Sequence, residues 1–134
     1  MTKHLRILLL AATSLVLVAV PMAQAKPTRT AATTVTVTTG KPSEFKFTLS
    51  AKSVPHGAVT FAVTNGGLLP HDLKICTAPA KTAADTCTGK GTALISPAGK
   101  ATLKVTFAAA GTYEYLCTVA GHATAGMKGL IKVT

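Results

Sequence analysis

The chain has 134 residues, with 14 lysines and arginines against 4 acidic residues and a formal net charge of +10. So few carboxylates leave little for general acid–base catalysis, and the sequence has no Ser/His/Asp arrangement or phosphate-binding glycine loop, so we expect no enzyme. The lysines are scattered singly, which argues against a nucleic-acid-binding surface.

The first 25 residues have the layout of a secretory signal peptide. Lys3 and Arg6 precede an apolar stretch over residues 7–20, and Ala23-Gln24-Ala25 is a small-residue cleavage signal. The apolar stretch ends at Pro21, short of the roughly 20 residues of a membrane-spanning helix. We therefore expect a periplasmic or secreted protein without stable membrane insertion of the mature chain, with an uncleaved anchor as the alternative.

The predicted mature chain consists of a flexible leader, residues 26–32 (KPTRTAA), and one domain, residues 33–134. Without Lys3 and Arg6, twelve lysines and arginines face four acids, a formal charge of +8. Such a charge favours solubility and can steer the protein toward an acidic partner.

Short β-type runs alternate with turn residues throughout the domain. The predicted strands cover residues 33–38, 44–50, 58–65, 71–76, 101–107, 112–117 and 129–133. Gly, Pro, Asn or Ser occupies nearly every gap, and no stretch shows a sustained helical period. Seven or eight such strands predict an all-β fold, an antiparallel Greek-key β-sandwich. Residues 77–86 are predicted to be a loop, with a short helical turn as an alternative.

Three cysteines in an exported chain leave one unpaired. Cys76 and Cys87 bracket a short polar loop, and a disulfide between them would stabilise the fold by about 2–3 kcal/mol. Cys117 then remains. A bound metal would explain its presence, and a buried, inert thiol is the alternative.

A candidate metal-binding motif follows the last of these cysteines. Four residues separate Cys117 from His122, and four more separate His122 from Met127. Thiolate, imidazole and thioether form a soft donor set that suits copper. A copper site with one Cys and two His in a plane and a weak axial Met needs a second histidine.

His71 is the candidate for that second histidine. In a strand over residues 71–76, period-two alternation places His71, Leu73 and Ile75 on the inward face and Cys76 on the other. The same alternation places Cys117 on one face with Tyr113 and Tyr115. A lone inward histidine is usually a core residue, but the downstream motif favours ligation. His56 is expected to be a solvated turn residue.

These motifs resemble those of the cupredoxins, the family of plastocyanin and azurin. His71 follows an Asn65-Gly66-Gly67 turn, and the other three donors lie in one C-terminal loop whose spacing is similar to that of rusticyanin and sulfocyanin. Ala120 stands where many members have proline. The resemblance covers nearly all of the mature chain. It also implies that Asp72 ties the two ligand loops together through Thr118 and tunes the thiolate.

The sequence favours one function and leaves two alternatives. The favoured function is an exported, monomeric protein with one type 1 (blue) copper, carrying single electrons between unidentified redox donor and acceptor proteins. His122 would be the electron port, with a rim of small and apolar residues: Leu68, Leu69, Pro70, Val119, Ala120 and Ala123. The alternatives are a copper carrier or storage protein without redox cycling, and a metal-free interaction module.

Overall fold

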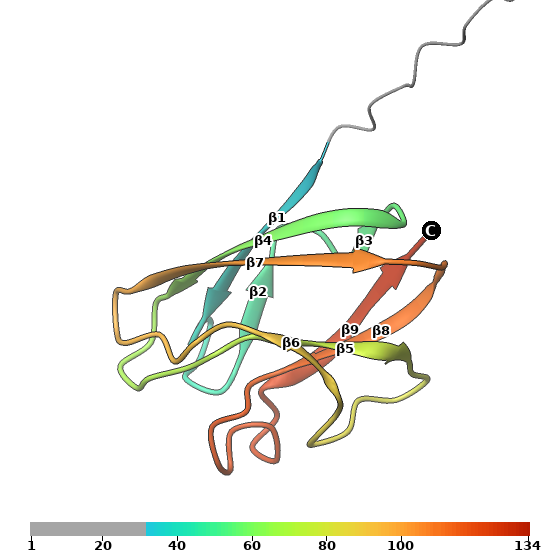
Figure 1. The fold of residues 1–134 in the computed structure, drawn as a ribbon. Coiled ribbons are helices and arrows are strands. Elements are labelled where there is room, and N and C mark those ends of the chain that lie inside the picture. The colour runs from blue at the N-terminus through green and yellow to red at the C-terminus, as the bar shows by residue number, and fades with distance from the viewer. Residues whose placement is uncertain (1–31) are drawn as a thin grey trace, which may run out of the picture.

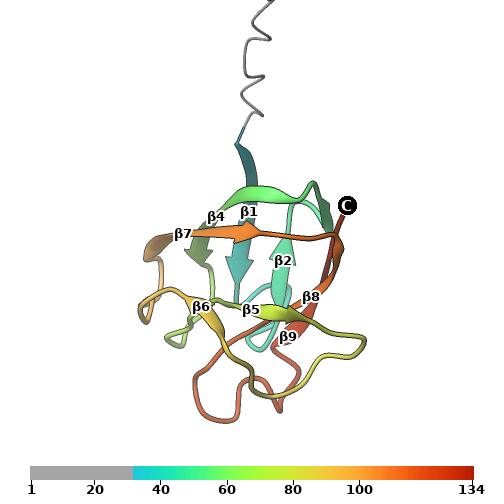
Figure 2. The same cartoon turned by 45° about the vertical axis from the view of Figure 1, so that its right-hand side comes forward.

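Two β-sheets pack face to face in residues 32–134, the part of the chain that the computed structural model describes (Figure 1, Figure 2). The strands are β1 (Thr33–Thr39), β2 (Phe47–Leu49), β3 (Ser53–Val54), β4 (Gly57–Asn65), β5 (Lys74–Pro79), β6 (Gly89–Gly91), β7 (Lys100–Phe107), β8 (Gly111–Leu116) and β9 (Lys128–Val133). The predicted signal peptide and all but the last residue of the predicted leader lie outside the described residues. Within residues 32–134, no helix has the length and apolarity needed to cross a membrane.

The two sheets have four and five strands. One has the order β2-β1-β4-β7, and the other has the order β3-β9-β8-β5-β6. The all-β sandwich is therefore confirmed, but it is not wholly antiparallel, because β1 pairs with β4 and β3 with β9 in parallel. The chain between β1 and β4 passes through β3 in the other sheet, so β4 returns beside β1 in the same direction.

The core between the sheets follows from the alternation of β-branched and aromatic residues. In β1, Val35 and Val37 are fully buried while Thr36 between them is exposed. In β4, Val59, Phe61 and Val63 repeat the pattern. Val35 and Val37 lie directly opposite Phe61 and Val63 in the parallel ladder, so their side chains pack as cross-strand pairs.

The boundaries of several predicted strands differ from the structure. Residues 44–46 form a turn, so the strand predicted over 44–50 begins only at Phe47. His71 precedes β5 and forms an isolated bridge with Ile95, while β5 extends to Pro79 into the predicted loop, which contains no helical turn. With two and three residues, β3 and β6 are too short to show a period.

The predicted disulfide links β5 to the segment before β6. Cys76 and Cys87 are bonded with a Cα–Cα separation of 5.7 Å. They pack with Leu116 and Ala123 in a second, smaller cluster, apart from the main core. Cys76 therefore faces away from the core face on which His71 and Ile75 lie, as the strand alternation predicts.

Candidate metal centre

The structure brings three of the four predicted donors into one cluster. His71 lies between β4 and β5, Cys117 directly follows β8, and His122 lies in the loop before β9. His71 Nδ1 is 3.1 Å from His122 Nδ1, and Cys117 Sγ is 3.5 Å from His122 Nδ1. These three ligand atoms all lie within 4.8 Å of one another.

Burial differs among the four donor residues. His71, Cys117 and Met127 are fully buried, whereas His122 keeps 8% of its surface exposed. Of the four donor residues, His122 is therefore the one that reaches the surface.

Backbone hydrogen bonds fold the loop over residues 118–127 back on itself. Cys117 N donates to Met127 O at 3.0 Å, and Met127 N donates to His122 O at 2.9 Å. Gly121 and Gly126 adopt left-handed backbone conformations, with φ of 81° and 100°, which non-glycine residues rarely adopt. Main-chain hydrogen bonds therefore link Met127 to both Cys117 and His122.

Asp72 connects the two loops that carry the donors. Its carboxylate accepts hydrogen bonds from Thr118 N at 2.6 Å and from the Thr118 hydroxyl. Thr118 follows Cys117 directly, and Asp72 follows His71, so this pair holds the two donor residues at a fixed separation.

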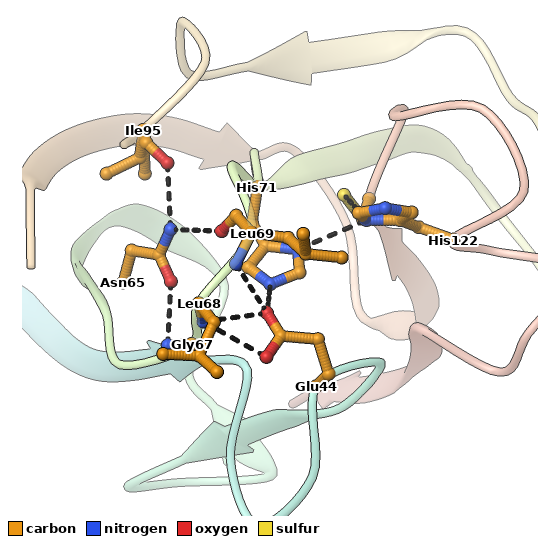
Figure 3. A network of polar contacts seen from close by, with 9 residues as sticks. Glu44, Asn65, Gly67, Leu68, Leu69, His71, Ile95 and His122 are labelled. Carbon is orange, nitrogen blue, oxygen red and sulfur yellow. Dashed lines mark hydrogen bonds and ion pairs between the residues drawn. The ribbon is translucent and has the colours of Figure 1, made fainter. Parts of the chain in front are cut away.

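Glu44 is a site residue that the sequence reasoning missed. Its Oε1 accepts a hydrogen bond from His71 Nε2 at 2.8 Å (Figure 3). The same carboxylate accepts hydrogen bonds from the backbone N–H groups of Leu68 and Leu69 at 3.0 and 2.9 Å. These backbone donors, followed by His71, lower the pKa of Glu44 to about 2. The carboxylate is ionised at neutral pH.

Asn65 holds the loop that carries His71. Its side-chain amide donates to the backbone oxygens of Leu69 and Ile95, both at 2.8 Å, and accepts from Gly67 N at 2.9 Å (Figure 3). Asn65 is 1% exposed, so these hydrogen bonds satisfy a buried amide and fix the turn. In the Asn65-Gly66-Gly67 motif, the asparagine side chain therefore fixes the loop through its hydrogen bonds, in addition to the turn that the glycines allow.

Burial also determines the electrostatics of the donors. Desolvation raises the pKa of the Cys117 thiol to about 11. Desolvation, followed by the neighbouring His71, lowers the pKa of His122. To hold a metal cation, Cys117 would have to lose its thiol proton, whereas the lowered pKa of His122 favours the neutral imidazole that a ligand needs.

A second group of potential ligands does not form a comparable site. Cys76, Cys87 and Glu114 lie close together, but the two sulfurs are joined in the disulfide and cannot act as thiolates. Glu114 is 2% exposed, and its burial raises its pKa.

The residues at the first cluster fit copper. Two imidazole nitrogens and one sulfur converge, the loop ends in a buried methionine, and no carboxylate among the described residues belongs to the converging group. Hard cations favour oxygen ligands, whereas thiolate, imidazole and thioether together favour copper. His71, Cys117, His122 and Met127 therefore form a site of the type 1 copper class.

Comparison with known proteins identifies the family. The model of the family described as "Copper binding proteins, plastocyanin/azurin family" matches residues 33–134. The chain belongs to this family, and the resemblance to cupredoxins is confirmed. No curated protein sequence matches the chain.

Solved structures show the same fold. Reduced auracyanin from Roseiflexus castenholzii matches with 24% identity and a TM-score of 0.63, covering 78% of this chain and 99% of that one. Rusticyanin from Thiobacillus ferrooxidans matches with 26% identity and a TM-score of 0.59, covering 75% and 76%. Auracyanin A from Chloroflexus aurantiacus, described as a "blue" copper protein, matches with 21% identity and a TM-score of 0.60, covering 75% and 98%.

Proposed function

We propose that this protein is an exported one-electron carrier with a single copper ion held by His71, Cys117, His122 and Met127. The observation that carries the proposal is the convergence of His71, Cys117 and His122, beside a loop that ends in the buried Met127, with His122 alone of the four keeping exposed surface. Bound copper would supply a Cu(I)/Cu(II) couple. Four protein donors leave no open position for a substrate, so we propose a carrier rather than an enzyme.

The frame around the donors supports electron transfer. Hydrogen bonds accepted by the carboxylates of Asp72 and Glu44, together with those within the 118–127 loop, fix the positions of the loops that carry the donors. Loops held by such hydrogen bonds would limit the rearrangement that accompanies a change in copper charge. Export follows from the predicted signal peptide, and a monomer is the proposed form.

An apolar surface beside the site suits brief docking of a redox partner. The large hydrophobic side chains exposed within residues 32–134 are Leu68 at 85%, Leu69 at 43% and Leu94 at 62%. Leu68 and Leu69 precede His71 in the chain, and Leu94 precedes Ile95, the residue that forms a β-bridge with His71. Leu68 and Leu69 were predicted as rim residues, Leu94 was not, and Ala123 is buried and contributes no rim surface.

The spectrum and the electron self-exchange rate together test the proposed function. The copper-loaded, oxidised protein is expected to be intensely coloured and to exchange electrons rapidly between its two oxidation states. A coloured protein with slow exchange would favour copper storage or delivery. A copper-bound but colourless protein would contradict the type 1 site.

Leu68→Lys is expected to slow electron self-exchange by about tenfold or more while leaving the visible spectrum unchanged. Two copies that meet through this surface would bring like charges together, which costs free energy in the encounter complex. The matched control is Thr106→Lys, which adds the same charge at another exposed position. Thr106 lies opposite Ala58, at the end of β4 that is remote from Asn65. Equal rates for the two variants would exclude the leucine surface as the docking site.

Met127→Leu is expected to retain copper and colour but to raise the reduction potential. A thioether donates weakly to the metal and stabilises Cu(II), whereas leucine donates nothing and still fills the buried space. The measurement is a redox titration of the visible band. Loss of copper, or an unchanged potential, would show that Met127 is not the axial ligand.

A further inference from the structure

Glu44 contacts a proposed copper ligand on the side away from the other donors. Its carboxylate meets Nε2 of His71, while Nδ1 of the same ring faces His122 (Figure 3). Among residues 32–134, no other carboxylate hydrogen-bonds to either donor histidine. His71 is fully buried, whereas the Glu44 side chain is 25% exposed at the surface beside it.

The position of Glu44 does not depend on the imidazole alone. Both carboxylate oxygens lie 3.0 Å from Leu68 N, and Oε1 lies 2.9 Å from Leu69 N. These backbone donors belong to the loop that leads to His71. The carboxylate is therefore fixed to the same loop as the ring that it orients.

Gly67 provides the space for this contact. A Cβ atom at residue 67 would lie 2.4 Å from Glu44 Oε1 and 2.9 Å from His71 Nε2. A side chain there would crowd both groups, so that the carboxylate or the imidazole would have to move. The second glycine of the Asn65-Gly66-Gly67 motif thus leaves the space in which Glu44 and His71 meet.

The two residues after Glu44 contact the other donor loop. The Phe45 ring packs edge-on against His122 with a centroid separation of 5.0 Å. Lys46 Nζ donates to Gly126 O at 3.4 Å, one residue before Met127. The turn over residues 44–46 therefore supports both loops that carry the donors.

An anionic acceptor at Nε2 has two effects on the ring. The ring must carry its proton at Nε2, so the lone pair of Nδ1 is free for a metal. The negative charge also makes the imidazole a stronger donor, as carboxylate partners of metal-bound histidines do. A stronger donor stabilises Cu(II) more than Cu(I), because the more highly charged ion gains more from it.

We propose that Glu44 is a positioning residue of the copper site, which holds His71 with Nδ1 toward the metal and lowers the reduction potential. The inference rests on the proposed function, because it assigns His71 as a ligand of a copper ion that changes oxidation state.

The first test is the reduction potential of Glu44→Gln. Glutamine retains an oxygen acceptor for His71 and for the backbone donors but removes the charge. We expect the preference for Cu(II) over Cu(I) to fall by about tenfold, the lower end of the usual effect of such partners on metal affinity. For a one-electron couple that factor is a rise of about 59 mV.

Two further variants accompany this test. Glu114→Gln makes the same chemical change at a glutamate in the disulfide cluster and is expected to leave the potential close to that of the wild type. Gly67→Ala separates Glu44 from His71 without altering either residue, and is expected to raise the potential as Glu44→Gln does.

The second test uses the wild-type chain and depends on no variant. Nitrogen chemical shifts of His71, measured in the copper-free and the Cu(I) forms, are expected to show a proton on Nε2. A proton on Nδ1 in the copper-free protein, or a wild-type potential in Glu44→Gln, would overturn the role of Glu44. A wild type that binds copper without colour would instead contradict the proposed function, and the nitrogen shifts would still test the Glu44–His71 contact.

Discussion

Cys117→Ser is expected to abolish the visible colour of the copper-loaded, oxidised protein. The intense band arises from charge transfer between the thiolate and Cu(II), and a serine oxygen is a harder and weaker donor to this ion. Cys117 is fully buried and is the one free cysteine among the described residues, so no other thiolate there can replace it. The measurement is the absorption spectrum at a fixed copper-to-protein ratio.

Circular dichroism of the copper-free variant provides the control for folding. The substitution replaces a sulfur by an oxygen of smaller size and leaves the backbone bonds between Cys117 and Met127 in place. We therefore expect a folded, colourless protein with weakened copper binding. A folded variant that keeps the full band would show that Cys117 is not the source of the colour.

Removal of the disulfide is expected to lower stability without removing the colour. In the double variant Cys76→Ala and Cys87→Ala, the free energy of unfolding should fall by about 2–3 kcal/mol, because the unfolded chain regains the entropy of an open loop. For a domain of this size the melting temperature falls by roughly 10 °C or more. Thermal unfolding followed by circular dichroism measures the change.

The colour of the double variant is expected to persist because the Cys76 side chain points away from the copper ligands. Cys76 packs with Leu116 and Ala123 in the smaller cluster, on the face of β5 opposite Ile75. Thiol counting on the denatured, copper-free wild type should find one free thiol, Cys117. Three free thiols, or loss of colour from a variant that still folds, would contradict this arrangement.

Local patterns were sufficient to predict most of the strands. Alternating β-branched and aromatic residues predicted β1, β4, β7, β8 and β9 to within a residue or two at their ends. Each of these strands buries one face against the core and is long enough to show the period. The parallel pairing of β1 with β4 could not be predicted in this way, because pairing depends on the path of the chain between them.

The turn over residues 44–46 shows where the local pattern was misleading. Phe45, Phe47 and Leu49 alternate as in a strand, but the chain turns before Phe47. The carboxylate of Glu44 gains two backbone donors and His71 in that turn, and Phe45 packs on His122. These contacts outweigh a weak strand preference, since such preferences depend on context.

The sequence by itself determined the chemistry of the site, because the identity of a donor atom is a property of its residue and three of the donors lie in one short loop. Only the tertiary structure decided how the fourth donor, His71, is held. Its partner Glu44 lies 27 residues earlier in the chain, and the carboxylate meets the ring at a place where Gly67 has no side chain to crowd them. Local periodicity in a sequence cannot reveal a contact between residues that are far apart in the chain.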